Sequence, residues 1–304
     1  MNFPFYIARR YLFSKKKHNA INIISGISVC GVALATLALV CTLSVFNGFQ
    51  DMVASFFTAF DPQLKITVRE GKVFDAQDKR IRAVCALPEV EVFTETLEEN
   101  AMVQYKDRQA MVVLKGVEDN FEELTAIDSI LYGAGEFLLH DSIVNYGVMG
   151  VELVATLGTG LEFVDPLQVY LPKRNAKVNM ANPGASFNRD YLYSPGVVFV
   201  VNQQEYDGKY ILTSLDFLRQ LLDYTTEVSA MELKLKPNVN ISSVQSKIEN
   251  ILGDDFVVQN RYQQQADVFR IMEIEKLISY LFLTFILMIA LSLIHISEPT
   301  RHAQ

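Results

Sequence analysis

Two long apolar segments enclose a region where hydrophobic and polar residues alternate at the spacing of strands and helices. The first apolar segment is residues 21–46, inside a longer stretch, 18–50, that contains no Asp, Glu, Lys or Arg. A helix of that length is about 39 Å long, enough for the ~30 Å hydrocarbon core of a bilayer. The second apolar segment is residues 277–290 and follows Lys276. We therefore expect two transmembrane helices with a large region between them.

The N-terminal flank carries the charge that orients the first helix. Residues 1–19 contain five basic residues and no acidic residue. Because basic flanks of membrane helices stay in the cytoplasm, we expect the N-terminus inside and the large region outside. A cleaved signal peptide that begins at Arg9-Arg10 is the alternative, but the apolar segment is longer than the apolar part of such peptides.

The region between the apolar segments has the mixed pattern of an α+β fold. Period-2 alternation and β-branched runs predict strands at residues 64–68, 90–94, 110–114, 168–171, 197–201 and 231–236. Helical spacing predicts helices at residues 76–86, 150–157, 214–224 and 242–252. The expected fold class is therefore a membrane protein with two transmembrane helices flanking a large mixed α/β domain.

Five parts follow from these patterns. They are a basic segment (1–19), the first transmembrane helix (20–46), the outer domain with helical stalks at both ends (47–276), the start of the second transmembrane helix (277–290) and a tail (291–304).

The apolar pattern of the first helix continues beyond the expected membrane surface. Phe46, Phe49, Val53, Phe56 and Phe60 follow alternating spacings of three and four residues. This spacing is typical of a coiled-coil seam and predicts a helical stalk. The seam could link membrane and domain mechanically or line an apolar ligand, or it could simply pack on the chain's own domain.

A long loop is predicted between two strands, over residues 172–196, because the stretch contains three Pro and two Gly. Loops of this length in compact domains are usually functional or disordered. Its basic and aromatic residues, among them Lys173, Arg174, Phe187 and Tyr191, are candidate contacts for an acidic or apolar partner. A solvated excursion of a hairpin is the equal alternative.

Charge and motif content exclude several functions. The net charge of −8 leaves about −13 for residues 20–276 once the basic N-terminus is set apart, which argues against nucleic-acid binding by the domain. No phosphate-binding loop, catalytic triad or Cys/His cluster is present, so we expect no enzyme activity, no catalytic residue, no metal site and no cofactor. Any ATP must be bound by a partner.

Residues 5–53 resemble the opening of a known family. The pieces ARRYL, SKK, AINIIS and LSVFNGF occur in the order in which the lipoprotein-releasing ABC transporter permeases have them. These permeases form the LolC/LolE family of the MacB/FtsX-like superfamily, and the resemblance extends over nearly all of residues 5–290. The chain departs from the family pattern because the third and fourth membrane helices and the cytoplasmic coupling helix are missing.

The resemblance implies a truncated permease subunit of the bacterial inner membrane, with its main domain in the periplasm. Its implied partners are an ABC ATPase, a second permease protomer, a periplasmic lipoprotein carrier, lipoprotein cargo and membrane lipid. The implied lipoprotein contacts are Phe46, Phe49, Val53 and Phe56. In that family a protruding loop of the outer domain recruits the carrier, so the loop residues Lys173, Arg174, Phe187 and Tyr191, chosen for their composition, are the candidate carrier contacts. The alternatives are a related permease for efflux or cell-division signalling, and a membrane-anchored binding module.

The last residues differ in character from the rest of the chain. LSLIHISEPTR, residues 291–301, resembles the translation of an adapter used to prepare sequencing libraries. We therefore expect residues 291–304 to be unrelated to function.

Overall fold

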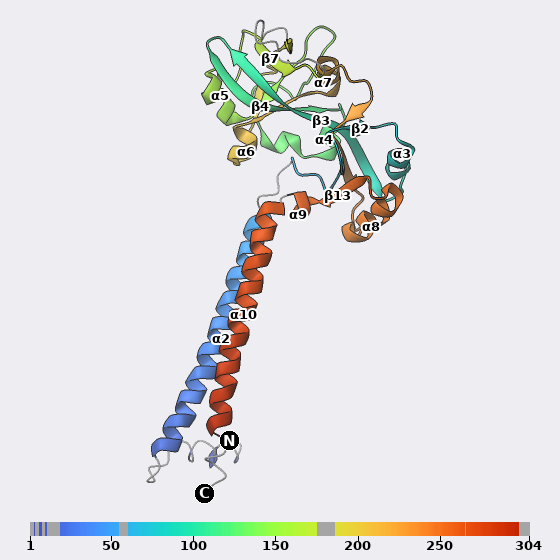
Figure 1. Ribbon diagram of the computed structural model, residues 1–304. Helices are drawn as coiled ribbons and strands as arrows, with labels where there is room; N and C mark the ends of the chain where they lie inside the picture. The colour runs from blue at the N-terminus through green and yellow to red at the C-terminus, as the bar shows by residue number, and fades with distance from the viewer. Residues whose placement is uncertain are drawn as a thin grey trace. The chain divides into compact units, whose positions relative to one another are not determined.

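The computed structural model describes residues 3, 6, 7, 10, 19–54, 60–174, 186–264 and 266–297 (Figure 1). The chain divides into two units. One unit combines Met1–Ser55 with Ala266–Gln304, and the other is Phe56–Gln265.

The first unit is a pair of long helices, α2 (Asn19–Ala54) and α10 (Ala266–Ser297), which lie side by side and run in opposite directions (Figure 1). Ala35 and Leu283 are buried, whereas most other described apolar side chains of the pair are exposed. Of the helices within the described residues, none combines the length and the hydropathy needed to cross a membrane. The two predicted spans therefore stay a prediction.

The second unit is built on a nine-stranded sheet of described residues. Seven strands follow in the order β13-β1-β12-β3-β4-β10-β6, and β7 joins β3 to β8. The strands are β1 (Leu64–Val68), β3 (Val90–Tyr105), β4 (Arg108–Val117), β6 (Val148–Met149), β7 (Leu167–Pro172), β8 (Phe187–Leu192), β10 (Tyr210–Ser214), β12 (Ala230–Leu235) and β13 (Phe256–Asn260). Two small sheets pair β2 (Phe74–Asp75) with β11 (Glu227–Val228) and β5 (Leu131–Gly133) with β9 (Val197–Phe199).

The long strand β3 connects two halves of this sheet. Its first half pairs with β12, its second half pairs with β7, and β4 runs antiparallel to it from Thr96 to Tyr105. β10 then adds to β4 in parallel. Because alternate side chains of a strand point to opposite faces, each half presents one apolar face to a core.

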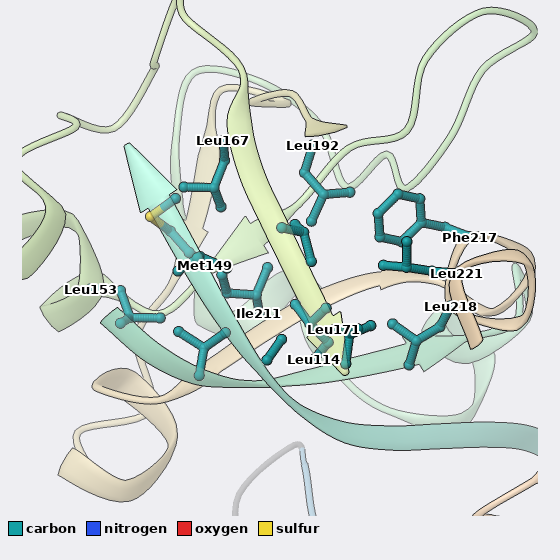
Figure 2. Close-up of a cluster of buried hydrophobic side chains, with 14 of the residues drawn as sticks. Leu114, Met149, Leu153, Leu167, Leu171, Leu192, Ile211, Phe217, Leu218 and Leu221 are labelled. Carbon is teal, nitrogen blue, oxygen red and sulfur yellow. The ribbon is translucent and has the colours of Figure 1, made fainter. Parts of the chain in front are cut away.

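Helices cover those apolar faces. The helices α3 (Lys79–Cys85) and α8 (Ile241–Leu252) pack on the half that contains β1, β12 and β13. The helices α5 (Val151–Leu157) and α7 (Leu215–Leu222) pack on the half that contains β4, β7 and β10, around the cluster in Figure 2. Short helices complete the unit: α4 (Phe121–Leu124), η1 (Ile127–Ile130), α6 (Gln204–Asp207) and α9 (Arg261–Gln264).

Local sequence explains the boundaries of these helices. The Ser214 hydroxyl accepts a hydrogen bond from the backbone N–H of Phe217, which caps α7, and Asp223 ends that helix in the left-handed region with φ 57°. Gly150 precedes α5, where a Cβ would lie 2.3 Å from the backbone oxygen of Asp207. Only glycine therefore allows α5 and α6 to approach so closely.

All six predicted strands and all four predicted helices occur, although β3 continues far beyond residue 94. Two predictions are wrong. Residues 172–196 are not one loop, because they contain the strand β8. The polar residues of β8 weaken its alternation, and the strand was therefore not predicted. Phe60 is not on a stalk helix; it lies in a turn, buried in the core of the second unit.

Charged residues are buried on the other face of the sheet. The Nζ of Lys115 on β4 lies 2.6 Å from Oε1 of Glu232 on β12, and the two residues are 2% and 0% exposed. Oε1 of Glu98 on β3 lies 3.7 Å from Lys115 Nζ and 3.1 Å from Lys65 Nζ. The hydroxyl of Tyr210 donates to Oε2 of Glu98 at 3.5 Å. These five side chains, of which Lys115 and Glu232 are buried and the other three are half-buried, extend over β1, β12, β3, β4 and β10. We call them the buried charge network.

The network favours the charged forms of Lys65 and Glu98. Burial acts against the charged form of Lys65, but Glu98 and Glu232 outweigh it and raise the pKa of Lys65 above its ordinary value. Burial also acts against ionised Glu98, but Lys65 and Lys115 outweigh it and hold the pKa of Glu98 below its usual range. Each charge is therefore stable only while its partners stay in place.

Removal of one charge from the closest pair should be costly. We expect Lys115→Met to lower the free energy of unfolding by about 3–5 kcal/mol, because Glu232 is left buried without its nearest cation. The double variant Lys115→Met with Glu232→Met should recover most of this loss, because no lone charge remains. Urea unfolding measures both. Equal losses in the single and the double variant would contradict the pairing.

Candidate functional site

The hairpin of β7 and β8 forms one edge of the sheet. Its strands pair from Leu167 with Leu192 to Pro172 with Phe187. The backbone N–H of Lys173 donates to the carbonyl oxygen of Ser186 at 2.9 Å, which extends the pairing by one step. The predicted carrier contacts therefore sit on a defined hairpin rather than on a free loop.

One face of this hairpin belongs to the core. Leu167, Leu171 and Leu192 are fully buried and lie in the cluster with Leu114 and Ile211 (Figure 2). This burial fixes the register, because a slip by one residue would turn these side chains to the opposite face. The same register fixes which side chains point away from the core.

The side chains on the opposite face form two rows across four strands. In the first row Met111 of β4 lies opposite Met102 of β3, which lies opposite Tyr170 of β7, which lies opposite Arg189 of β8. The second row lies two residues away along each strand and has the same strand order. It consists of Gln109, Gln104, Gln168 and Tyr191. We call these eight residues the open sheet face.

The open sheet face is accessible and nearly free of charge. Met111 is 68% exposed and Tyr191 is 38% exposed, while the Gln109 amide donates to Oε1 of Gln104 at 3.2 Å. The Tyr170 hydroxyl donates to Oε1 of Gln168 at 2.7 Å. The one charged residue of the eight is basic, although the chain as a whole is acidic.

Met, Tyr and Arg are the residue types that protein interfaces favour. Methionine adapts its shape to a partner, and tyrosine supplies a large rigid contact with a polar end. The arrangement offers a protein partner two methionine and two tyrosine side chains with amide groups beside them. It contains no group positioned for covalent chemistry.

The structure places all four predicted carrier contacts on this hairpin or at its end. Lys173 and Arg174 are exposed just after β7, and Phe187 opens β8 directly across from Pro172. The guanidinium carbon of Arg174 lies 5.0 Å from the ring centroid of Tyr224, a cation–π contact. Of the four, Tyr191 belongs to the open sheet face. Residues 175–185 of the predicted loop lie outside the described residues.

Three of the four predicted lipoprotein contacts belong to the helical unit. Phe46, Phe49 and Val53 are within α2, and their side chains lie outside the described part of the chain, as does Phe56 altogether. Their assignment stays a prediction.

Sequence reasoning missed Met102 and Met111. They lie on two different strands, and only the register places them opposite each other and in one row with Arg189. The sequence offers no alternation that marks Met111, because residues 111–114 are all apolar, and the burial of Val112 and Leu114 is seen only in the structure.

No group of three or more His, Cys, Asp and Glu residues that could hold a metal ion occurs within the described residues. His140 Nε2 lies 3.0 Å from Oδ1 of Asp119, an exposed pair at the surface. Burial raises the pKa of Cys85 to about 11, which keeps this thiol protonated and unreactive at neutral pH.

The sequence matches a known family model. The MacB-like periplasmic core domain matches residues 25–251, most of the chain. The chain therefore belongs to the MacB-like periplasmic core domain family. Most of the matched residues lie in the mixed α/β domain described above.

Related proteins agree with the resemblance seen at the N-terminus. The lipoprotein-releasing system transmembrane protein LolC of Xylella fastidiosa is 22% identical over 291 residues, which cover 92% of this chain and 66% of that protein. The corresponding LolE of Haemophilus influenzae is 22% identical over 300 residues, which cover 95% and 68%. The chain thus spans about two thirds of the length of these curated relatives. The resemblance to the LolC/LolE family is confirmed.

A solved structure is also similar. The crystal structure of the periplasmic region of MacB from Actinobacillus actinomycetemcomitans is 11% identical, with a TM-score of 0.44, over 67% of this chain and 91% of that one.

Substitutions on β4 should separate the open sheet face from the core. We expect Met111→Asp to change the free energy of unfolding by less than about 0.5 kcal/mol, because the side chain already faces solvent. Leu114→Ala on the same strand should cost about 2–5 kcal/mol, because it leaves a cavity. Urea unfolding of both variants is the measurement. A loss of several kcal/mol for Met111→Asp would show that this face is covered.

Proposed function

We propose that the chain is the N-terminal part of a permease subunit of an ABC transporter that extracts lipoproteins from the bacterial inner membrane. The transporter passes them to a periplasmic carrier, and a separate ATPase supplies the energy. The observation that carries the proposal is the match to LolC and LolE over more than nine tenths of the chain. The subunit itself is not an enzyme.

The proposed topology follows from the charge and the apolar segments. Residues 1–19 stay in the cytoplasm because they are basic, and residues 20–46 and the segment from 277 cross the membrane. The second unit then lies in the periplasm, where a soluble carrier can reach it. A second permease protomer and membrane lipid are the further partners.

In this proposal the open sheet face, with Lys173, Arg174 and Phe187 beside it, receives the carrier. Three basic side chains, Lys173, Arg174 and Arg189, lie on this one hairpin, and long-range attraction by a basic surface speeds the encounter with an acidic partner. Met102, Met111 and Tyr191 then supply the apolar contact that holds it. We assign the acyl chains of the cargo to the seam of Phe46, Phe49, Val53 and Phe56.

A related permease for efflux or cell-division signalling is the second candidate. The name of the matching family, MacB-like, suits either task. The names of the relatives favour lipoprotein release.

Depletion of the full-length protein tests the proposal in cells. We expect lipoproteins to accumulate in the inner membrane, and wild-type protein supplied in trans should restore their sorting. Fractionation of the two membranes measures this. Normal sorting after depletion would contradict the proposed function.

The same cells test the carrier surface. The double variant Met111→Asp with Tyr191→Asp should fail to restore sorting, because it places two charges in the apolar part of the face. Val164→Asp is the matched control, since Val164 is 89% exposed in the loop before β7 and is not part of the face. Full restoration by the double variant would show that the carrier does not bind this surface. It would not contradict the proposed function.

A further inference from the structure

The second unit holds the two ends of its described chain together. β1 runs antiparallel to β13, with Leu64 opposite Asn260, so the start of β1 and the end of β13 meet at the same edge. Residues 60–63 form the incoming segment, and residues 260–264 form the outgoing segment. Chain ends of domains usually fray unless they are tied down.

The incoming segment is buried although it is not a strand. The Phe60 ring is 3% exposed, and its centroid lies 4.7 Å from that of Phe199 and 5.2 Å from that of Tyr206. The Nζ of Lys115 lies 5.9 Å from the same ring centroid. Phe60 therefore packs directly against a member of the buried charge network.

Side chains of the outgoing segment bind the backbone of the incoming one. Nε of Arg261 donates to the carbonyl oxygen of Asp61 at 2.9 Å, and Nε2 of Gln264 donates to the carbonyl oxygen of Pro62 at 3.1 Å. The Tyr206 hydroxyl donates to Oδ1 of Asp61 at 3.0 Å. Burial, together with this carboxylate, raises the pKa of Tyr206 above its ordinary value. The hydroxyl stays protonated and able to donate.

The outgoing segment is fixed in turn to the rest of the unit. Gln245 of α8 is buried, and its Nε2 donates to the carbonyl oxygen of Val258 at 2.9 Å and to Oε1 of Gln263 at 2.8 Å. The side chain of Asn260 donates to Oε1 of Gln245 at 3.0 Å. The hydrogen bonds that Arg261 and Gln264 donate therefore come from a segment that is itself held in place by hydrogen bonds.

We propose that Phe60, Asp61, Pro62, Arg261 and Gln264 form a load-bearing joint, which we call the terminal joint. Two antiparallel strands pulled apart from one end lose their hydrogen bonds one at a time. Crosslinks at that end prevent the first step, so both chain connections open only when the sheet opens. When Phe60 or Gln264 is displaced, the joint therefore moves the whole sheet with it.

Native-state hydrogen exchange of the full chain in detergent tests the joint. In the wild type, peptides covering residues 60–66 and 256–264 should exchange as slowly as those of the β3–β4 hairpin, with the same dependence on urea. In the variant Arg261→Gln with Gln264→Ala, they should exchange at least about tenfold faster, because a hydrogen bond from a charged donor is lost. The single variant Gln264→Ala should show a smaller increase in exchange rate. It replaces the double variant in the test if the double variant unfolds.

Arg69→Gln is the matched control. Nε of Arg69 donates to the carbonyl oxygen of Asp254 at 2.7 Å, at the opposite end of the same strand pair. This variant should leave exchange at residues 60–64 and 260–264 unchanged. Equal exchange in the joint variant and the control, or independent opening of these segments in the wild type, would overturn the proposal.

The role of the joint in transport rests on the proposed function. Measurements on a reconstituted transporter distinguish a failure of the joint from a failure of the proposed function. The joint variant should hydrolyse ATP at the normal rate but release severalfold less lipoprotein per ATP, whereas the control should release the normal amount. Absence of release by the wild type would count against the proposed function alone. Normal release by a joint variant whose terminal segments exchange rapidly would overturn the load-bearing role.

Discussion

The arrangement of the sheet depends on the buried ion pair of Lys115 and Glu232. These residues lie on β4 and β12, which both pair with β3, and they are 2% and 0% exposed. A slip of either strand by one residue would turn one charge into the apolar cores on the opposite face. A buried charge without its partner costs several kcal/mol, so the pair permits only one register. That register also places Met102 and Met111 opposite each other on the open sheet face.

This constraint connects the two surfaces that the proposed function uses. β3 carries Glu98 of the network in its middle and Met102 of the open sheet face four residues further on. Phe60 of the terminal joint packs against Lys115, which lies 3.7 Å from Glu98 of β3. In the proposal, a displacement of the joint therefore reaches β4 and β3 through side chains that are in contact.

The sequence predicted the element types well because strands and helices of this unit have clear apolar periodicity, as in residues 64–68 and 242–252. It failed at β8, where the consecutive polar residues Asn188, Arg189 and Asp190 interrupt the apolar pattern and only pairing with β7 makes a strand. The carrier candidates Lys173, Arg174, Phe187 and Tyr191 came from loop composition, and the structure groups them on one hairpin. Met111 could not be found, because exposure of a methionine on a strand depends on what covers that face.

The central claim, that the open sheet face receives a lipoprotein carrier, is tested most directly by photo-crosslinking in cells. A photoreactive amino acid is placed at Met111 or Tyr191 of the full-length protein, with Val164 as the control position. The proposal predicts an adduct with a soluble periplasmic lipoprotein carrier from Met111 and Tyr191, and none from Val164. No carrier adduct from either face position, or an equal adduct from all three positions, would contradict it.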